Sequence, residues 1–223
     1  IGVSAALFVI FHLKGEWVGA KGEAFDIKGS FLYMTGLVAL LYGMSAITSS
    51  SLAKYILVSG AILLITFIYC ENKVEYPLIR MELFTKNLGF AFSNLAAMIN
   101  YSSITAVGFI ISLYLQVVLG YGAQIAGLIL ISQPAVMALF SSSAGSLSDR
   151  IDAHIVASWG MGISALGLFI LIFINAQTPI WVIVANLALI GFGVALFASP
   201  NSNAIMGSVK PHVYGVASST MST

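Results

Sequence analysis

The stretch Ile180–Met206, IWVIVANLALIGFGVALFASPNSNAIM, decides the class of fold, because it contains no Asp, Glu, Lys or Arg. A helix needs about 20 consecutive apolar residues to cross the hydrocarbon core of a bilayer. Across the whole chain only 8% of the residues are charged and the mean hydropathy is +1.01. Soluble domains average about 25% charged residues. The sequence therefore predicts an integral membrane protein.

Five further stretches have the same apolar character and length: Gly29–Thr48, Leu52–Cys70, Leu88–Leu115, Ala123–Ser143 and Ile155–Ile174. We expect helices, because lipid offers the backbone no hydrogen-bond partner. Ile1–Phe11 and the run that begins at Gly215 are predicted half-spans. The expected fold is thus an all-α polytopic membrane protein with six full spans and a half-span at each end. Since the chain starts without Met inside an apolar run, we interpret it as a fragment of a longer protein.

The basic residues indicate which connections face the cytoplasm. Alternate connections hold every Lys and Arg except Lys54. Cytoplasmic loops of membrane proteins are enriched in these residues. We therefore predict cytoplasmic linkers at 12–28 and 71–87, and cytoplasmic turns near Arg150 and Lys210. The second linker is either a short membrane-surface helix or an ordinary polar connection.

Several amide side chains interrupt the apolar spans: Asn94, Asn100, Gln116, Gln133 and Asn201 are our candidate contacts of a substrate cavity, with Asn186 and Asn203 as further amides. An amide in lipid faces either protein or a water-filled cavity. Each one alone is better explained by a hydrogen bond between helices, whereas the group favours a polar-lined cavity. Pro134 and Pro200 predict helix kinks, because proline removes a backbone donor.

Small residues recur at every fourth position in two spans. Gly191, Ala195 and Ser199 form one row, and Ser158 and Gly162 repeat the spacing. Such rows allow helices to approach closely. We predict that both rows are packing contacts.

The remaining polar residues exclude several functions. No span carries a Lys, Arg, His or carboxylate near its middle, so a proton-carrying residue is expected outside this piece. His12, His154 and His212 are far apart, and Cys70 is the single cysteine. We therefore expect no metal site and no disulfide. No basic patch indicates nucleic acid, and no motif of a hydrolase or nucleotide-binding enzyme is present.

A charged turn, GSLSDR, separates two spans. It contains Gly145, Asp149 and Arg150. Asp149 is expected to cap the N-terminus of the following helix, where the helix dipole favours negative charge. The turn is either a latch between helix ends or a solvated connection.

This turn resembles the G-x-x-x-D-R loop motif of the major facilitator superfamily. SLYLQVVLGYGAQIAGLILISQPAVM (Ser112–Met137), YPLIRMELFTKNLGFAFSNLAAMINY (Tyr76–Tyr101) and SPNSNAIMGSV (Ser199–Val209) are similar to its fourteen-helix drug:proton antiporter branch. The turn departs from the family pattern after Ile151, where Asp152 and His154 replace a basic cluster.

The resemblance implies a partial major facilitator fold. Residues 1–11 would end the last helix of the N-terminal half, 29–70 would be two extra inserted helices, and 88–223 would be an incomplete C-terminal half. The missing N-terminal half would be its partner, together with the lipid bilayer.

The implied function is proton-coupled efflux of lipophilic or cationic drugs by alternating access, across a bacterial cytoplasmic membrane. The proton gradient would be the energy source, without a cofactor, and Gly145, Asp149 and Arg150 would form a cytoplasmic gating loop. The alternative is an exporter of one specific lipid, siderophore or antibiotic. A polytopic membrane enzyme is the alternative from another class.

Overall fold

The computed structural model describes residues 26–74, 77–209 and 214–222, and every regular element in this part of the chain is a helix. The predicted half-span Ile1–Phe11 and nearly all of the predicted linker 12–28 lie outside the described residues. The chain divides into two compact units, Ile1–Arg80 and Met81–Thr223. We describe each unit by itself.

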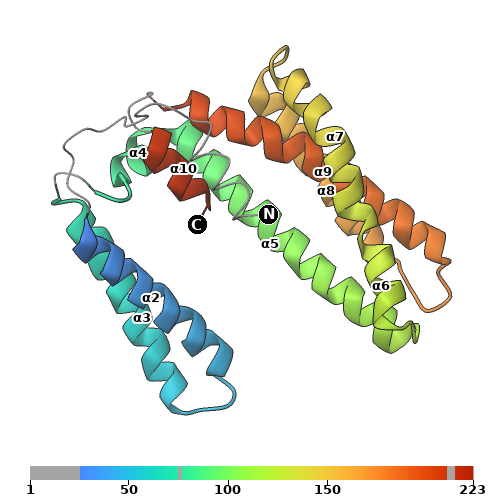
Figure 1. Cartoon of the computed structure of the whole chain (residues 1–223), viewed down its shortest axis with the longest axis horizontal. Coiled ribbons are helices and arrows are strands. Elements are labelled where there is room, and N and C mark those ends of the chain that lie inside the picture. The colour runs from blue at the N-terminus through green and yellow to red at the C-terminus, as the bar shows by residue number, and fades with distance from the viewer. Residues whose placement is uncertain (1–25, 75–76, 210–213, 223) are drawn as a thin grey trace, which may run out of the picture. The chain divides into compact units, whose positions relative to one another are not determined.

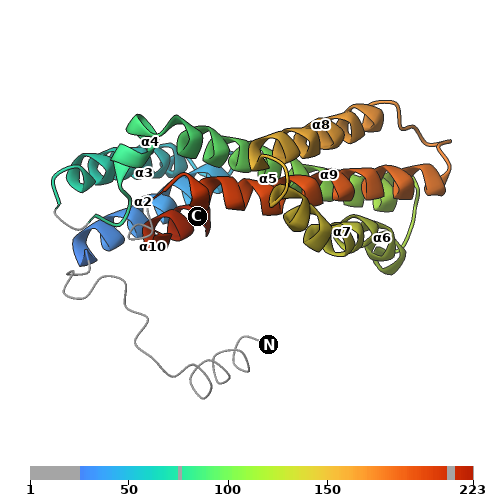
Figure 2. The ribbon, with the colours of Figure 1, turned by 90° about the horizontal axis from the view of Figure 1, so that it is seen from above.

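The first unit contains a helical hairpin of α2 (Ile27–Ala46) and α3 (Leu52–Glu71), which lie side by side in both views (Figures 1 and 2). The Asp26 carboxylate caps α2 by accepting a hydrogen bond of 2.8 Å from the Gly29 N–H. Glycines allow the two helices of the hairpin to pack closely. A Cβ atom on Gly60 would lie 2.5 Å from the backbone nitrogen of Leu40, so only glycine allows the two backbones this distance.

The second unit contains all remaining helices: α4 (Met81–Lys86), α5 (Leu88–Leu113), the π-helix η1 (Tyr114–Val118), α6 (Ala123–Leu130), α7 (Ser132–Ser148), α8 (Ala153–Leu171), α9 (Ile180–Gly207) and α10 (Tyr214–Ser222). Helix α9 is central to this unit. It packs along both α7 and α8 and crosses α5 (Figure 2). Half of its apolar stretch is buried, more than in any other described membrane-length helix.

Six helices of the described chain are long and apolar enough to cross a membrane, which confirms the predicted number of full spans. The two spans with an internal proline differ from each other. The span that begins at Ala123 runs on to Ser148, with a break at Ile131, three residues before Pro134. Helix α9, in contrast, continues through Pro200. A proline therefore coincides with an interruption in one span and with a continuous helix in the other.

One of the two predicted rows of small residues is a packing contact. A Cβ atom on Gly191 would collide with the Gln133 carbonyl oxygen of α7. The prediction for Gly162 is wrong, because nothing lies within 4 Å of the position of its Cβ atom. The α8–α9 contact instead uses Gly160, whose added Cβ would lie 2.6 Å from the Gly193 carbonyl oxygen. Spacing alone does not tell which side of α8 faces α9.

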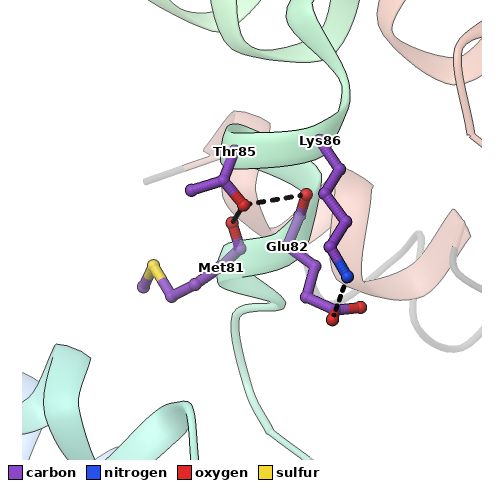
Figure 3. A network of polar contacts seen from close by, with 4 residues as sticks. All are labelled: Met81, Glu82, Thr85 and Lys86. Atoms are coloured by element: carbon purple, nitrogen blue, oxygen red, sulfur yellow. Dashed lines mark hydrogen bonds and ion pairs between the residues drawn. The ribbon is translucent and has the colours of Figure 1, made fainter.

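The linker helix α4 begins at Met81 and lies next to α5. Its residues Leu83 and Phe84 pack on a cluster around Phe90, and the Phe84 and Phe90 ring centroids are 5.1 Å apart. The opposite side carries an exposed ion pair between Lys86 Nζ and Glu82 Oε1 at 2.7 Å (Figure 3). This short helix is thus amphipathic, with part of its apolar side covered by protein.

Candidate functional site

The five amides predicted to line a cavity are distributed over α5, which holds two of them, η1, α7 and α9. Asn100 on α5, Gln133 on α7 and Asn201 on α9 are buried, with 6%, 8% and 5% of their surface exposed. Asn94 is half-buried, and Gln116 is exposed in the π-helix η1. The structure therefore separates three interior amides from two that lie nearer the surface of the unit.

Asn201 links α9 to α5. Its Nδ2 donates a hydrogen bond of 3.2 Å to the Ser93 carbonyl oxygen. Both residues also border a groove of about 480 Å³ between α5, α8 and α9, together with Phe92 and Phe197. Asn201 thus joins two helices and also borders the groove.

Asn94 and Gln116 are hydrogen-bonded within their own helical segments. Asn94 Nδ2 donates to the Phe90 carbonyl oxygen at 2.8 Å. Gln116 Nε2 donates to the Ser112 hydroxyl at 2.9 Å. The π-helical turn around Gln116 is a feature often found at functional sites, and the sequence pattern did not indicate it.

Gln133 lies at the contact between α7 and α9. The space that a Cβ atom on Gly191 would need is taken by the Gln133 backbone carbonyl. The Gln133 side chain is buried beside this contact. The Gln133–Pro134 pair is therefore placed where the two helices approach closely.

Two links between segments involve amides outside the five predicted cavity contacts. Asn186 Nδ2 of α9 donates to the Gly167 carbonyl oxygen of α8 at 3.0 Å. Asn87 Nδ2, before α5, donates to the Ser208 carbonyl oxygen after α9 at 2.6 Å. An amide inside an apolar run is the only sequence signal for Asn186, and it does not reveal the partner.

The predicted gating loop connects α7 to α8. Gly145 packs on α9, since its added Cβ would lie 3.0 Å from Ser199 Oγ. Asp149 and Arg150 are exposed, and no ion pair of either is found among the described residues. The predicted cap is wrong, because the cap of α8 is Asp152, whose carboxylate accepts from the His154 N–H at 2.9 Å. Asp149 instead follows the last residue of α7.

A hydrogen bond holds the start of this loop against α9. Asn203 Nδ2 donates to Ser148 Oγ at 2.9 Å. Ser148 is the last residue of α7 and directly precedes Asp149. The Asn203 amide thus holds the α7 end of the loop, and the exposed Asp149 and Arg150 follow directly after this contact.

A buried carboxylate lies in the first unit, outside all predicted sites. Glu71, the last residue of α3, has 3% of its surface exposed. A Cβ atom on Gly29 would lie 2.9 Å from Glu71 Oε1 and would also collide with the Asp26 carboxylate, so both acids border one small space. Within the described residues no three His, Cys, Asp or Glu side chains gather as a metal site would require.

Comparison with known proteins identifies the family. Residues 93–223, more than half of the chain, match the Major Facilitator Superfamily. The chain is 26% identical to the riboflavin transporter RibZ of Clostridioides difficile, over 100% of the chain and 48% of that protein.

Two further relatives carry names that refer to multidrug resistance or transport. The multidrug resistance protein Stp of Mycobacterium tuberculosis is 26% identical over 97% of the chain and 41% of its own length. The multidrug transporter protein MdtP of Bacillus subtilis is 27% identical over 99% of the chain and 41% of its own length. The chain therefore spans less than half the length of these curated relatives.

The structure and the comparisons agree on the class of protein. Six membrane-length apolar helices within the described part of the chain identify an integral, multi-pass membrane protein. RibZ and MdtP are named as transporters, and Stp is named as a multidrug resistance protein. By the match of its residues 93–223, the chain belongs to the Major Facilitator Superfamily.

Proposed function

We propose that this chain is the middle and C-terminal part of a fourteen-helix exporter that removes lipophilic or cationic drugs in exchange for protons. The observation that carries the proposal is similarity along nearly the whole chain to transporters named for multidrug resistance or transport. In this assignment α2 and α3 are the two extra helices, and α5 to α10 belong to the C-terminal half. The missing N-terminal half completes the transport path.

The groove beside Asn201 supports a drug-sized substrate. Its volume of about 480 Å³ lies within the range of about 300–1,000 Å³ that is typical of small-molecule sites. Phe92 in its wall is 64% exposed and offers aromatic surface to an apolar or cationic ligand. Asn201 contributes the polar group, and Asn94, Asn100, Gln116 and Gln133 stay predicted contacts along the path. Export then proceeds by alternating access, as the two halves of the protein move around the site.

The charges support the proposed orientation and energy source. Helix ends near Lys86, Arg150 and Lys210 face the cytoplasm by the distribution of basic residues. No described span carries an acidic residue near its middle, so the carboxylate that exchanges protons is assigned to the part of the transporter outside this chain. A proton gradient across a bacterial cytoplasmic membrane drives the cycle, and no cofactor is required.

A second candidate is an exporter of one specific compound, such as a lipid, a siderophore or an antibiotic. The relative named as a riboflavin transporter favours it, because that name refers to a single compound. The same helices and the same groove serve both candidates.

The test uses the full-length protein in inside-out vesicles energised by a pH gradient. Ethidium fluorescence reports dye uptake, and a trapped pH indicator reports proton release. We expect dye uptake coupled to proton release, abolished when the gradient is collapsed. Dye movement indifferent to the gradient contradicts proton coupling. Absence of both signals contradicts broad drug export and favours the single-compound candidate.

The proposed latch has its own test in the same vesicles. Asp149→Ala is expected to reduce dye transport by about tenfold, the effect of losing about 1.4 kcal/mol of state-specific interaction, without reducing the amount of protein in the membrane. Glu82→Gln is the matched control, because it removes an exposed carboxylate far along the chain from the loop. Normal efflux by Asp149→Ala at normal expression rules out the latch.

A further inference from the structure

One turn of α9, Ser199–Asn203, contacts a neighbouring helix on each of two sides. Asn201 Nδ2 donates to the Ser93 carbonyl oxygen of α5 at 3.2 Å. Asn203 Nδ2 donates to Ser148 Oγ at the end of α7 at 2.9 Å. Residues two positions apart point to nearly opposite sides of an α-helix, because successive residues are about 100° apart around its axis. The same turn therefore holds α5 with one amide and α7 with the other.

The contact with α7 extends beyond the Asn203 hydrogen bond. A Cβ atom on Gly145 would lie 3.0 Å from Ser199 Oγ, so α7 and α9 also pack closely about one turn before Ser148. The Ser148 hydroxyl accepts from Asn203 and donates to the Gly145 carbonyl oxygen at 2.7 Å. Asn203 thus holds the last turn of α7 through a chain of two hydrogen bonds.

The backbone of the predicted gating loop is bonded to this last turn of α7. The Asp149 N–H donates to the Gly145 carbonyl oxygen at 3.3 Å. The Arg150 and Ile151 N–H groups donate to the Leu147 carbonyl oxygen at 3.1 and 3.0 Å. A movement of the α7 end changes these three bonds, so the three N–H groups report whether the loop is held.

On its other side the turn borders the groove of about 480 Å³, which is lined by both Asn201 and Ser93. A ligand hydrogen-bonded to the Asn201 amide draws this side chain into the groove and weakens its bond to Ser93. Pro200 allows the turn to respond, because it has no N–H to donate to the Leu196 carbonyl oxygen. The end of α9 is therefore less firmly tied to the rest of the helix beside the groove.

We propose that the turn Ser199–Asn203 couples the groove to the gating loop: a ligand on Asn201 shifts the turn, and the end of α7 is released. Asn203 is a positioning residue, because it acts on the loop through Ser148 and does not line the groove. The inference rests on the proposed function in one respect, namely that the groove is the site of the exported compound. The coupling itself can be tested without that compound.

The first experiment is hydrogen–deuterium exchange of the full-length protein in nanodiscs, read by mass spectrometry. Asn201→Ala removes the donor to Ser93 and is expected to raise exchange at 149–151 by about two- to tenfold, the effect of one lost hydrogen bond. Ser202→Ala is the matched control, because its hydroxyl lies in the same turn and donates within α9, to the Ala198 carbonyl oxygen at 2.9 Å. Equal loop exchange in the two variants overturns the proposal.

Two further measurements separate coupling from general loosening. Thr178, at the far turn between α8 and α9, donates its N–H to the Asn175 carbonyl oxygen at 2.8 Å and is expected to exchange equally in every variant. Asn203→Ala is expected to raise loop exchange by itself, and adding Asn201→Ala is expected to raise it no further, because the connection is already cut. Additive effects of the two substitutions, or an equal rise at Thr178, contradict coupling through Asn203.

Ethidium then tests the link to the proposed function. In the wild type, saturating ethidium is expected to raise loop exchange as Asn201→Ala does, and this response is expected to be lost in Asn203→Ala. Ethidium transport without a change at the loop overturns the proposal, as does a response that persists in Asn203→Ala. If ethidium is neither bound nor transported while Asn201→Ala still raises loop exchange, the coupling stands and broad drug export is wrong.

Discussion

The α2/α3 hairpin and the α8/α9 hairpin both pack through glycine contacts, but they differ in the polar groups between their helices. In each, a glycine lets backbones meet: Gly60 lies against Leu40, and Gly160 against Gly193. Only α8/α9 adds a polar link, between Asn186 and the Gly167 carbonyl oxygen. Within Ile27–Ala46 and Leu52–Glu71 no side-chain hydrogen bond joins the two helices.

The two hairpins show separately how close packing and polar links contribute to helix association. In lipid the hydrophobic effect does not drive helices together, so association rests on van der Waals contact and interhelical hydrogen bonds. Glycine contacts are sufficient to close α2/α3. The α8/α9 hairpin lies within the residues that match the superfamily, whereas α2/α3 lies outside them. The hairpin inside that match is thus the one with a polar link between its helices.

The largest expected effect comes from filling a glycine contact. Gly160→Ala is expected to lower the free energy of unfolding by about 1–3 kcal/mol, because its Cβ meets the backbone of α9. Gly60→Ala is expected to cost a similar amount in α2/α3. Gly162→Ala is the control and is expected to stabilise α8 by about 0.5–1 kcal/mol, because its Cβ enters open space. Thermal unfolding of the purified full-length protein measures all three, and equal effects of Gly160→Ala and Gly162→Ala contradict the observed contact.

The next largest expected effect comes from removing the hydrogen bond between Asn186 and Gly167, which is present only in the α8/α9 hairpin. Asn186→Leu keeps the side-chain size but removes the donor to Gly167, and is expected to cost about 0.6–1.7 kcal/mol. Asn94→Leu is the matched control, because the Asn94 amide bonds only within its own helix. It is expected to change stability by less than about 0.5 kcal/mol. Equal losses in the two variants, measured in the same unfolding assay, leave the polar link without a role.

The smallest expected effect is at the ion pair of α4, which follows the α2/α3 hairpin in the chain and precedes α5. Lys86 and Glu82 are each 73% exposed. A double-mutant cycle of Lys86→Gln and Glu82→Gln is expected to give a coupling of at most about 0.5 kcal/mol, which salt reduces further. A coupling above about 1 kcal/mol that persists at high salt means that α4 is held more firmly than a solvated helix.

Much of the fold was predictable from local composition. The six spans and the amide-bearing run of α9 were visible in the chain. The choice between Asp149 and Asp152 as the cap of α8 was not, because both acids precede the same helix and the path of the turn decides between them. The burial of Glu71 was not visible either, because its position at a span end is equally typical of an exposed acid.

The candidate site was predictable only as a set of residue types. The amides of the spans were recognisable, but the structure divides them between helix links, such as Asn186 and Asn201, and bonds within one helix, such as Asn94. The unpaired groups at Asn100 and Ser164 emerged only from the packing of three helices. Residue type identifies a polar group in lipid, and its neighbours decide what it binds.

Local sequence composition set the membrane-spanning character of this chain, the number of full spans in its described part and the positions of the basic connections. These properties follow from the thickness of the hydrocarbon core and the cost of placing charge in it, both of which act on short stretches of chain. The packing of the helices, in contrast, decided that Gly160 and not Gly162 meets α9, and that Ser164 Oγ lies against Gly193. A helix can take any rotation about its own axis, and an α-helix that is apolar on nearly every side has no sequence signal for one rotation. Packing against neighbouring helices therefore sets the side that each residue faces.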